Sequence, residues 1–194
     1  MNKNIIALTV VLLLGVSLVG APYVNFPFLH NSSIPVASAA AVDYFLTIDG
    51  VSGESMDHPG AIELNSWSWG ETNSSGHGGG GGAGKVSMQD FHFTMKTSKA
   101  SPKLMLAVAS GEHFKKAVLM ARKPGGDRQD YLIITLSDVL VTSYQVGGSN
   151  GDVPTDEISI NFSKIEFEYR TQNADGSAGE VMKAGWDLGK NKKI

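Results

Sequence analysis

Cysteine is absent from this sequence, and charged residues are few, at 18% of the chain. The lack of cysteine excludes disulfide bonds, thiol catalysis and zinc sites built on thiolates, and it leaves the redox compartment open. The formal net charge of -3 gives no basic excess of the kind that attracts nucleic acid or an anionic membrane surface. We therefore expect no nucleic-acid partner.

Motifs for catalysis and metal binding are missing as well. The sequence has no G-x-S-x-G elbow, no H-E-x-x-H motif and no cysteine–histidine pair. Asp152, Asp156 and Glu157 do not have the spacing of an EF-hand calcium loop. Four histidines lack a second ligand at metal-binding spacing: His58, His77, His92 and His113. We expect no metal, no cofactor and no enzyme activity.

One pair of carboxylates leaves an enzymatic alternative open. Glu166 and Glu168 alternate with the apolar residues Ile165 and Phe167, so both face the same side of an expected strand. Two carboxyl groups on one face can act as acid and base. A solvated sheet face is the favoured interpretation, and a secreted binding module or hydrolase on a barrel is the alternative.

Residues 1–40 have the features of an export leader. Lys3 precedes an apolar run over residues 5–21, and Val36-Ala37-Ser38-Ala39-Ala40 places small residues at a cleavable site. The run is short for a spanning helix, which needs roughly 20 residues. We predict a signal peptide, with an uncleaved anchor and linker as the alternative. Membrane contact is then expected only through residues 5–21, and residues 41–194 form one domain.

A glycine-rich stretch follows Trp69 and resembles a phosphate loop only in part. Gly79 to Lys85 has the P-loop spacing, but Val86 replaces the required serine or threonine, and an alternating strand pattern replaces the helix. We therefore predict a flexible arm that becomes ordered against a partner chain. The residues assigned to this assembly loop are Gly76, Gly78, Gly79, Gly80, Gly81, Gly82, Gly84 and Lys85.

Most of the domain alternates apolar and polar residues, which is the period of a strand. Phase slips predict bulges near Asn65 and Asp90 and around residues 163–164, and Ser137-Asp138 is expected to turn a hairpin. The expected strands are 42–48, 62–69, 86–95, 117–123, 131–136, 139–146, 158–169 and 181–188. Residues 190–193 are expected to be a solvated basic end.

One helix is expected after residue 100. Ser101 is its predicted N-cap, Pro102 its first residue, and Gly111 its stop. With so many strands and short turns, the sequence predicts a mainly β fold, a closed antiparallel barrel or two-sheet sandwich with one helix. The segment 131–136 is apolar on both faces, which suggests that one face is covered by subunit assembly.

If Trp67 and Trp69 both face the core, Ser68 faces outward between them. Together with seven other segments of the domain, this tryptophan-containing segment resembles the haemolysin-coregulated protein (Hcp) family. The segments that carry the resemblance are 41–46, Gly53-Glu54-Ser55, Trp67-Ser68-Trp69-Gly70, 78–86, Gln89-Asp90, 101–105, 131–136 and Gly185-Trp186.

The resemblance implies an inner-tube protein of type VI secretion, a β-barrel with one helix that forms hexameric rings stacked into a hollow tube. It implies that the 70–86 arm makes ring and stacking contacts, that the lumen carries small effectors, and that Ser68 lies on the lumen wall. Other type VI secretion components are implied partners. The leader departs from the family pattern, so an exported ring or filament component acting outside the cytoplasm is the alternative to cytoplasmic assembly and type VI export.

Overall fold

The computed structural model describes residues 42–73, 86–123 and 129–194. The predicted leader and the assembly loop, Gly76 to Lys85, lie outside the described residues. The elements are β1 (Asp43–Ile48), β2 (Ile62–Ser68), β3 (Glu71–Asn73), β4 (Val86–Met88), β5 (Phe91–Lys96), α1 (Ser101–Ser110), β6 (His113–Arg122), β7 (Asp130–Gly147), β8 (Thr155–Asn161), β9 (Lys164–Gln172), β10 (Ala178–Asp187) and β11 (Lys192–Lys193).

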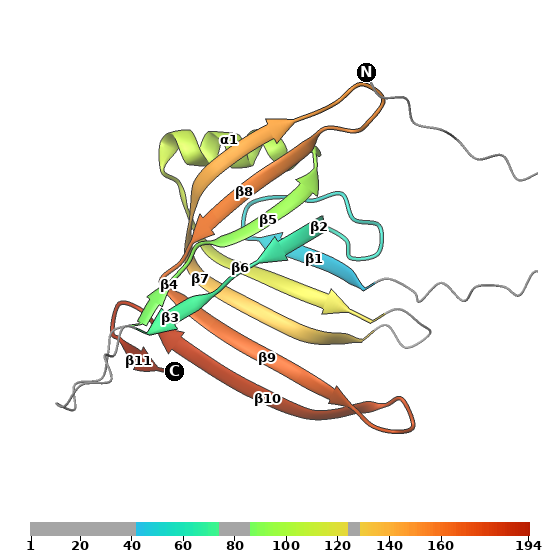
Figure 1. The fold of residues 1–194 in the computed structure, drawn as a ribbon, viewed down its shortest axis with the longest axis vertical. Helices are drawn as coiled ribbons and strands as arrows, with labels where there is room; N and C mark the ends of the chain where they lie inside the picture. The colour runs from blue at the N-terminus through green and yellow to red at the C-terminus, as the bar shows by residue number, and fades with distance from the viewer. Residues whose placement is uncertain (1–41, 74–85, 124–128) are drawn as a thin grey trace, which may run out of the picture. The chain divides into compact units, whose positions relative to one another are not determined.

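An antiparallel sheet closes on itself to form a barrel. The strands follow the order β7-β6-β1-β2-β5-β8, and β8 pairs back onto β7. The first half of β7 pairs with β9, and the second half pairs with β8. Beyond β9 the sheet continues through β10 to β11, so that β9 and β10 extend away from the barrel (Figure 1). The predicted mainly β barrel with one helix is confirmed.

The barrel encloses an apolar core to which every one of its strands contributes. Phe91, Phe93 and Met95 alternate inward from β5, and Leu104 of α1 packs into the same cluster. Burying a side chain of this size contributes roughly 1.5–3 kcal/mol relative to leaving it exposed. Other fully buried members are Leu46, Leu119, Ile134, Leu136, Val139, Ile158 and Ile160. The alternation in the sequence therefore sets which face of each strand packs inward.

The expected single strand over residues 86–95 is wrong. It is two strands in different sheets, because β4 pairs with β3 whereas β5 pairs with β2 and β8. The chain changes direction at Gln89-Asp90, where the Gln89 N–H donates to the Gly70 carbonyl at 2.9 Å. The expected bulge near Asp90 is therefore a break between sheets.

The expected hairpin at Ser137-Asp138 is also wrong. The chain continues as the single strand β7. Within this strand Asp138 has a positive φ of 54°, which is a local irregularity of the backbone. β6 begins at His113, earlier than expected, and pairs across the irregularity through Lys116 with Ser137 and Phe114 with Val139. A long partner strand thus overrides a local turn signal.

Residues 158–169 do not form one strand. β8 ends at Asn161 and β9 begins at Lys164, and both run antiparallel to β7 on the same side. Between them Phe162 is buried, and the Ser163 N–H donates to the Ser137 carbonyl at 3.0 Å. The phase slip was placed correctly, but it separates a barrel strand from a strand of the extension.

Two assignments at the ends of elements need correction. Ala100, not Ser101, occupies the N-cap of α1, because the Ser101 N–H already closes a turn onto the Ser98 carbonyl at 3.0 Å. Pro102 is therefore the second helical residue. Gly111 ends the helix with a φ of 67°, as predicted. The basic residues 190–193 are exposed as expected, but Lys192–Lys193 pairs with β10 as β11.

Candidate assembly site

Ser68 is held at the surface by the two tryptophans that flank it. Trp67 and Trp69 are partly buried against the core, and Ser68 is exposed, as predicted. The Trp67 ring stacks on Phe91 with centroids 5.7 Å apart and planes 7° apart. Leu64 and Trp67 both face the core although they are three residues apart, because the register of β2 against β5 shifts near Asn65. This shift confirms the predicted bulge.

Polar side chains surround Ser68 on the outer face of β2, β5 and β8. His92 lies opposite Ser68, and Ser159 lies opposite His92. Ser66 and Thr94 share a hydroxyl hydrogen bond of 2.7 Å, and His92 Nδ1 lies 3.2 Å from Ser159 Oγ. We call this surface the polar wall, consisting of Ser66, Ser68, His92, Thr94 and Ser159. Because its serine and threonine side chains are short, the wall projects little from the sheet and offers hydroxyl groups for hydrogen bonding.

Sequence reasoning treated His92 as unpartnered and missed most of the polar wall. The signal was present within β5, where His92 and Thr94 alternate with buried Phe91, Phe93 and Met95. The register between distant strands, which brings Ser159 beside His92, has no local signal. The surface forms because the sheet brings together His92 and Ser159, which are 67 residues apart in the sequence.

One end of the polar wall is fixed by Asp90. Its carboxylate accepts hydrogen bonds from Thr142 Oγ1 at 2.6 Å and from Asn161 Nδ2 at 2.7 Å. These bonds tie the start of β5 to β7 and β8 at the point where the chain leaves β4. Charge-assisted hydrogen bonds of this kind are stronger than neutral ones. The chain between β4 and β5 is thereby tied to the barrel.

The ribbon β3–β4 carries the assembly loop. Glu71 pairs with Met88 and Asn73 with Val86, so residues 74–85 connect the two strands of a ribbon that is separate from the barrel sheet. Figure 1 shows this ribbon at the lower left of the barrel. A Cβ at Gly70 would lie 3.2 Å from Gln89 Oε1, so a side chain there would crowd the bend.

Apolar side chains are exposed where the sheet extends beyond the barrel. Phe167 and Tyr169 of β9 and Met182 of β10 are 39%, 40% and 54% exposed. Tyr169 pairs with both Leu132 and Met182, so these residues continue the inward-facing layer past the edge of the core. We call Phe167, Tyr169 and Met182 the apolar stripe. The apolar stripe is therefore a candidate contact surface.

The segment 131–136 packs against its own chain on both faces, but only Ile134 and Leu136 are buried, and the other residues are partly exposed. Ile134 and Leu136 lie in the main core, while Ile133 packs against a smaller buried cluster of Phe45, Ala61 and Met120. The suggestion that subunit assembly covers the second face stays a prediction, because Tyr131 and Ile133 on that face are only partly buried in the single chain. The apolar stripe, which the sequence did not single out, is an exposed apolar surface of the described residues, as are Met105 and Leu106 of α1.

One of the two carboxylates considered for acid–base work, Glu168, is paired with cations. Glu168 lies 2.6 Å from Lys183 and 3.2 Å from Arg170, and these hydrogen bonds, the one from Lys183 foremost, lower the pKa of Glu168. Glu166 is exposed on the same face, beside a shallow cavity that Glu168 and Lys183 also line. The ionised form of Glu168 is thus favoured, which suits a salt bridge better than a general acid.

The other candidate ligands are dispersed. His113 is an exposed residue that pairs with Asp138 at 3.0 Å, and His58 lies against Phe45 with ring centroids 5.6 Å apart. Asp156 is buried and accepts a hydrogen bond from Thr97 Oγ1 at 2.6 Å. Within the described ranges no three histidine or acidic residues gather as metal ligands, and no helix is long and apolar enough to cross a membrane.

Comparison with known proteins decides the family. A sequence profile described as "Type VI secretion system effector, Hcp" matches residues 45–169. Protein hcp1 of Pseudomonas aeruginosa is 46% identical over 158 residues, which cover 78% of this chain and 98% of that protein. The chain belongs to the Hcp family. As an Hcp protein it is a structural ring and tube component of type VI secretion.

Solved structures agree with this family and its fold. One, described as a type six secretion system protein, is 32% identical with a TM-score of 0.74, over 79% of this chain and all of that chain (100%). Hcp1 from Salmonella typhimurium is 34% identical with a TM-score of 0.67, over 80% and 100%. The Hcp profile begins within β1, so the predicted leader lies outside it.

Proposed function

We propose that this Hcp protein forms hexameric rings in which the apolar stripe of one copy packs against the next copy. The observation that carries this proposal is the exposure of Phe167, Tyr169 and Met182 on a sheet that extends beyond the closed barrel. A partner that removes these apolar side chains from water stabilises the association by roughly 25 cal/mol per Å² of apolar surface buried. In a closed ring, the apolar stripe of every copy packs against the next copy.

The polar wall is proposed as the lining of the lumen. It has hydroxyl and imidazole groups and none of the large apolar residues that would hold cargo irreversibly. Its hydrogen bonds between neighbouring strands leave it firm, which suits a channel through which effector proteins pass. Ser68 is exposed on this wall, and its two chain neighbours, Trp67 and Trp69, pack against the core.

We propose that stacking of these rings uses the assembly loop at the tip of the β3–β4 ribbon. The β3–β4 ribbon is separate from the barrel sheet, and the loop connects its two strands. No catalytic step is assigned to this chain, because Glu168, one of the two carboxylates considered for it, is engaged with Lys183 and Arg170.

An exported ring or filament component is the second candidate, and the leader favours it. Lys3, the apolar run and the small residues before Ala41 form a complete signal-peptide pattern. Intact mass and compartment of the natural protein test this. A chain beginning near Ala40 or Ala41 outside the cytoplasm supports export by the leader, and an unprocessed cytosolic chain supports assembly in the cytoplasm followed by type VI export.

Substitution of the apolar stripe tests the ring contact. Met182→Asp places a charge where the stripe packs, and we expect ring dissociation to become at least about tenfold easier, as for a central interface residue. Val181→Asp is the matched control, because Val181 is 38% exposed and lies in the opposite phase of the same strand. Native mass spectrometry over a concentration series measures the ring fraction. Equal loss of rings in both variants contradicts the assignment.

A further inference from the structure

The turn between β7 and β8 lies at one end of the barrel and is exposed throughout. It follows Gly147, which pairs with Thr155 at the end of the two strands, and every residue from 145 to 154 is exposed. Figure 1 shows this turn beyond the start of β8. Among the described residues, the core takes no side chain from the turn. A chemical change within the turn therefore removes no packed side chain from the barrel.

Asn150 and Gly151 stand at the middle of this turn and form the one Asn-Gly pair of the sequence. Gly151 has a φ of 97°, and a Cβ built on it meets no heavy atom within 4 Å. The Asp152 N–H donates to the Ser149 carbonyl at 3.3 Å, and Ser149 Oγ donates to Asp152 Oδ2 at 3.0 Å. Within the described ranges, the Asn150 amide and the Gly151 N–H make no hydrogen bond. The turn thus holds its flanking residues and leaves these two groups free.

Two other asparagines of the domain have amides that are already engaged. Asn161 Nδ2 donates to Asp90 at 2.7 Å, and Asn173 Nδ2 donates to Ser177 Oγ at 3.0 Å. Neither asparagine is followed by glycine. Their amides must give up these hydrogen bonds before they react, whereas the Asn150 amide has none to give up within the described residues.

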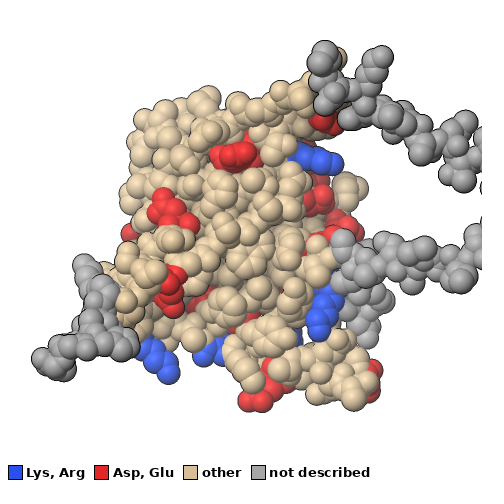
Figure 2. Space-filling view, viewed as in Figure 1, with Lys and Arg blue, Asp and Glu red and all other residues tan. Residues whose placement is uncertain are grey.

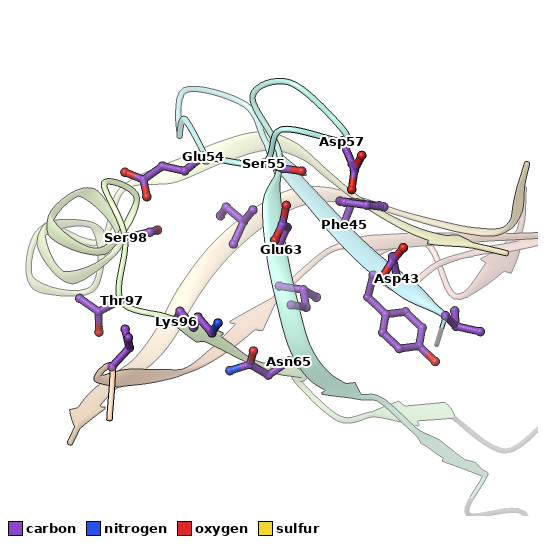
Figure 3. Close-up of a pocket in the computed structure, with 15 residues that line it drawn as sticks. Asp43, Phe45, Glu54, Ser55, Asp57, Glu63, Asn65, Lys96, Thr97 and Ser98 are labelled. Atoms are coloured by element: carbon purple, nitrogen blue, oxygen red, sulfur yellow. The ribbon is translucent and has the colours of Figure 1, made fainter. Parts of the chain in front are cut away.

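Asn65 separates the effect of exposure from the effect of a following glycine. It is exposed, and together with Lys96 it lines a cavity over β1, β2 and β5 (Figure 3). The next residue is Ser66, which carries a side chain and pairs with Thr94 in the sheet. Asn65 therefore matches Asn150 in exposure but not in its neighbour, and it serves as an internal control.

The turn also borders a cavity whose charges are balanced. This cavity has a volume of about 640 Å³, and among its described lining residues Lys96 is the one basic and Asp152 the one acidic residue. Figure 2 shows acidic and basic atoms close together at the upper right of this face. A carboxylate at position 150, between the lining residues Ser149 and Gly151, would add negative charge to this rim.

From these observations we infer that Asn150 converts to aspartate and isoaspartate in the folded chain, with water as the only co-reactant. Asparagine is among the chemically labile residues of proteins, and a following glycine has no Cβ to obstruct the reaction. The Gly151 backbone nitrogen attacks Asn150 Cγ and loses its proton to water. The bond from Cγ to the amide nitrogen breaks, and ammonia leaves with a proton taken from the solvent. The product is a succinimide ring that joins the two residues.

Water then opens the succinimide at one of its two carbonyl carbons. Addition at Cγ breaks the new bond to the Gly151 nitrogen and gives aspartate. Addition at the Asn150 backbone carbonyl carbon breaks the original peptide bond and gives isoaspartate, in which the main chain runs through Cγ. Overall one water is consumed, one ammonia is released, and a neutral amide becomes a carboxylate. The fraction converted then records the age of the chain.

Peptide mapping of the ageing full-length chain tests this inference. The chain is held at neutral pH and physiological temperature, and mass spectrometry follows the change from amide to acid at each asparagine. We expect acid to form at Asn150 well before it forms at Asn65, Asn161 or Asn173. An isoaspartyl carboxyl methyltransferase with S-adenosylmethionine then labels the isoaspartate fraction of each peptide.

Two variants test the roles of the two residues separately. Asn150→Gln lengthens the side chain, so the succinimide ring can no longer form, and we expect the methyl label to be lost from the peptide that contains the turn. Gly151→Ala keeps the asparagine and adds only a Cβ, which meets no heavy atom within 4 Å but obstructs the approach of the nitrogen. We expect acid formation at Asn150 to slow in this variant.

Conversion that is faster at Asn150 than at Asn65, and that is lost in Asn150→Gln, supports the inference. An Asn150 amide that persists, or acid that forms equally fast at Asn65, overturns it. Unchanged labelling of the turn peptide in Asn150→Gln, or unchanged acid formation in Gly151→Ala, also overturns it. None of these outcomes depends on ring formation, so each leaves the proposed ring function as it stands.

Discussion

The polar wall depends on which single residues point outward. Ser68 reaches the surface because Trp67 and Trp69 both pack inward, and His92 is held by Ser159 across the sheet. Larger side chains at these positions would narrow a lumen, whereas hydroxyls keep it wide and wettable. At the scale of single residues, the proposed lumen lining requires side chains that are small, polar and held in place.

Asp187 gives a prediction at the residue scale. Its hydrogen bond from the Lys190 backbone N–H, and secondarily its contact with Lys164, lower the pKa of this carboxyl group. A lowered pKa in the folded state stabilises the fold above the unfolded pKa, about 3.9 for aspartate, and this stabilisation is lost as pH falls through the folded pKa. We expect Asp187→Asn to unfold more easily than wild type at neutral pH.

The pH profile separates this effect from a simple loss of packing. The difference in unfolding free energy between wild type and Asp187→Asn should be largest above about pH 5 and should shrink below about pH 4. Urea unfolding at several pH values measures it. A difference that is constant across that range would show that the carboxylate charge is not the cause.

At the scale of elements, β7 organises the molecule. It is one strand of the large sheet that pairs with β9 along its first half and with β8 along its second half. The irregularity at Asp138 and the break at Phe162-Ser163 lie beside each other, joined by the Ser163–Ser137 hydrogen bond. The barrel closes on one side of this joint, and the extension that carries the apolar stripe begins on the other.

The end of α1 gives a prediction at the element scale. Gly111 has a φ of 67° and no heavy atom within 4 Å of a built Cβ, so an added methyl group meets open space but a strained backbone. We expect Gly111→Ala to lower the free energy of unfolding by about 1–2 kcal/mol. Gly147→Ala is the control, since it also meets no atom within 4 Å and lacks a positive φ. Equal unfolding midpoints in urea for the two variants would contradict the assignment.

Local pattern predicted the parts of the fold that depend on local chemistry. Alternation identified β1 and β2, the slip near Asn65 and the outward position of Ser68, and a glycine marked the end of α1. The errors at Ser137-Asp138 and at Gln89-Asp90 arose because long-range pairing decided whether a local irregularity became a turn, a kink or a change of sheet. His92 and the apolar stripe were missed for the same reason.

At the scale of the whole molecule, the assembly loop should act on stacking and not on folding. Deleting Gly78–Gly82 shortens a connection outside the barrel core, so the thermal unfolding midpoint should change little while ring stacking weakens. Glycine contributes reach here and no packed side chain. Differential scanning calorimetry and sedimentation measure the two properties. A parallel loss of both would contradict a separate assembly role.

The polar wall is the central claim, and its position in the assembled ring is directly measurable. The chain has no cysteine, so Ser68→Cys introduces a single thiol label site. Rings and stacks of this variant are treated with a small maleimide and with a bulky polymer-linked maleimide, and the Ser68→Cys/Met182→Asp variant provides the dissociated control. The account predicts that both reagents label the dissociated chain, whereas only the small reagent labels stacks rapidly. Equally rapid labelling of stacks by the bulky reagent would contradict a lumen-facing wall.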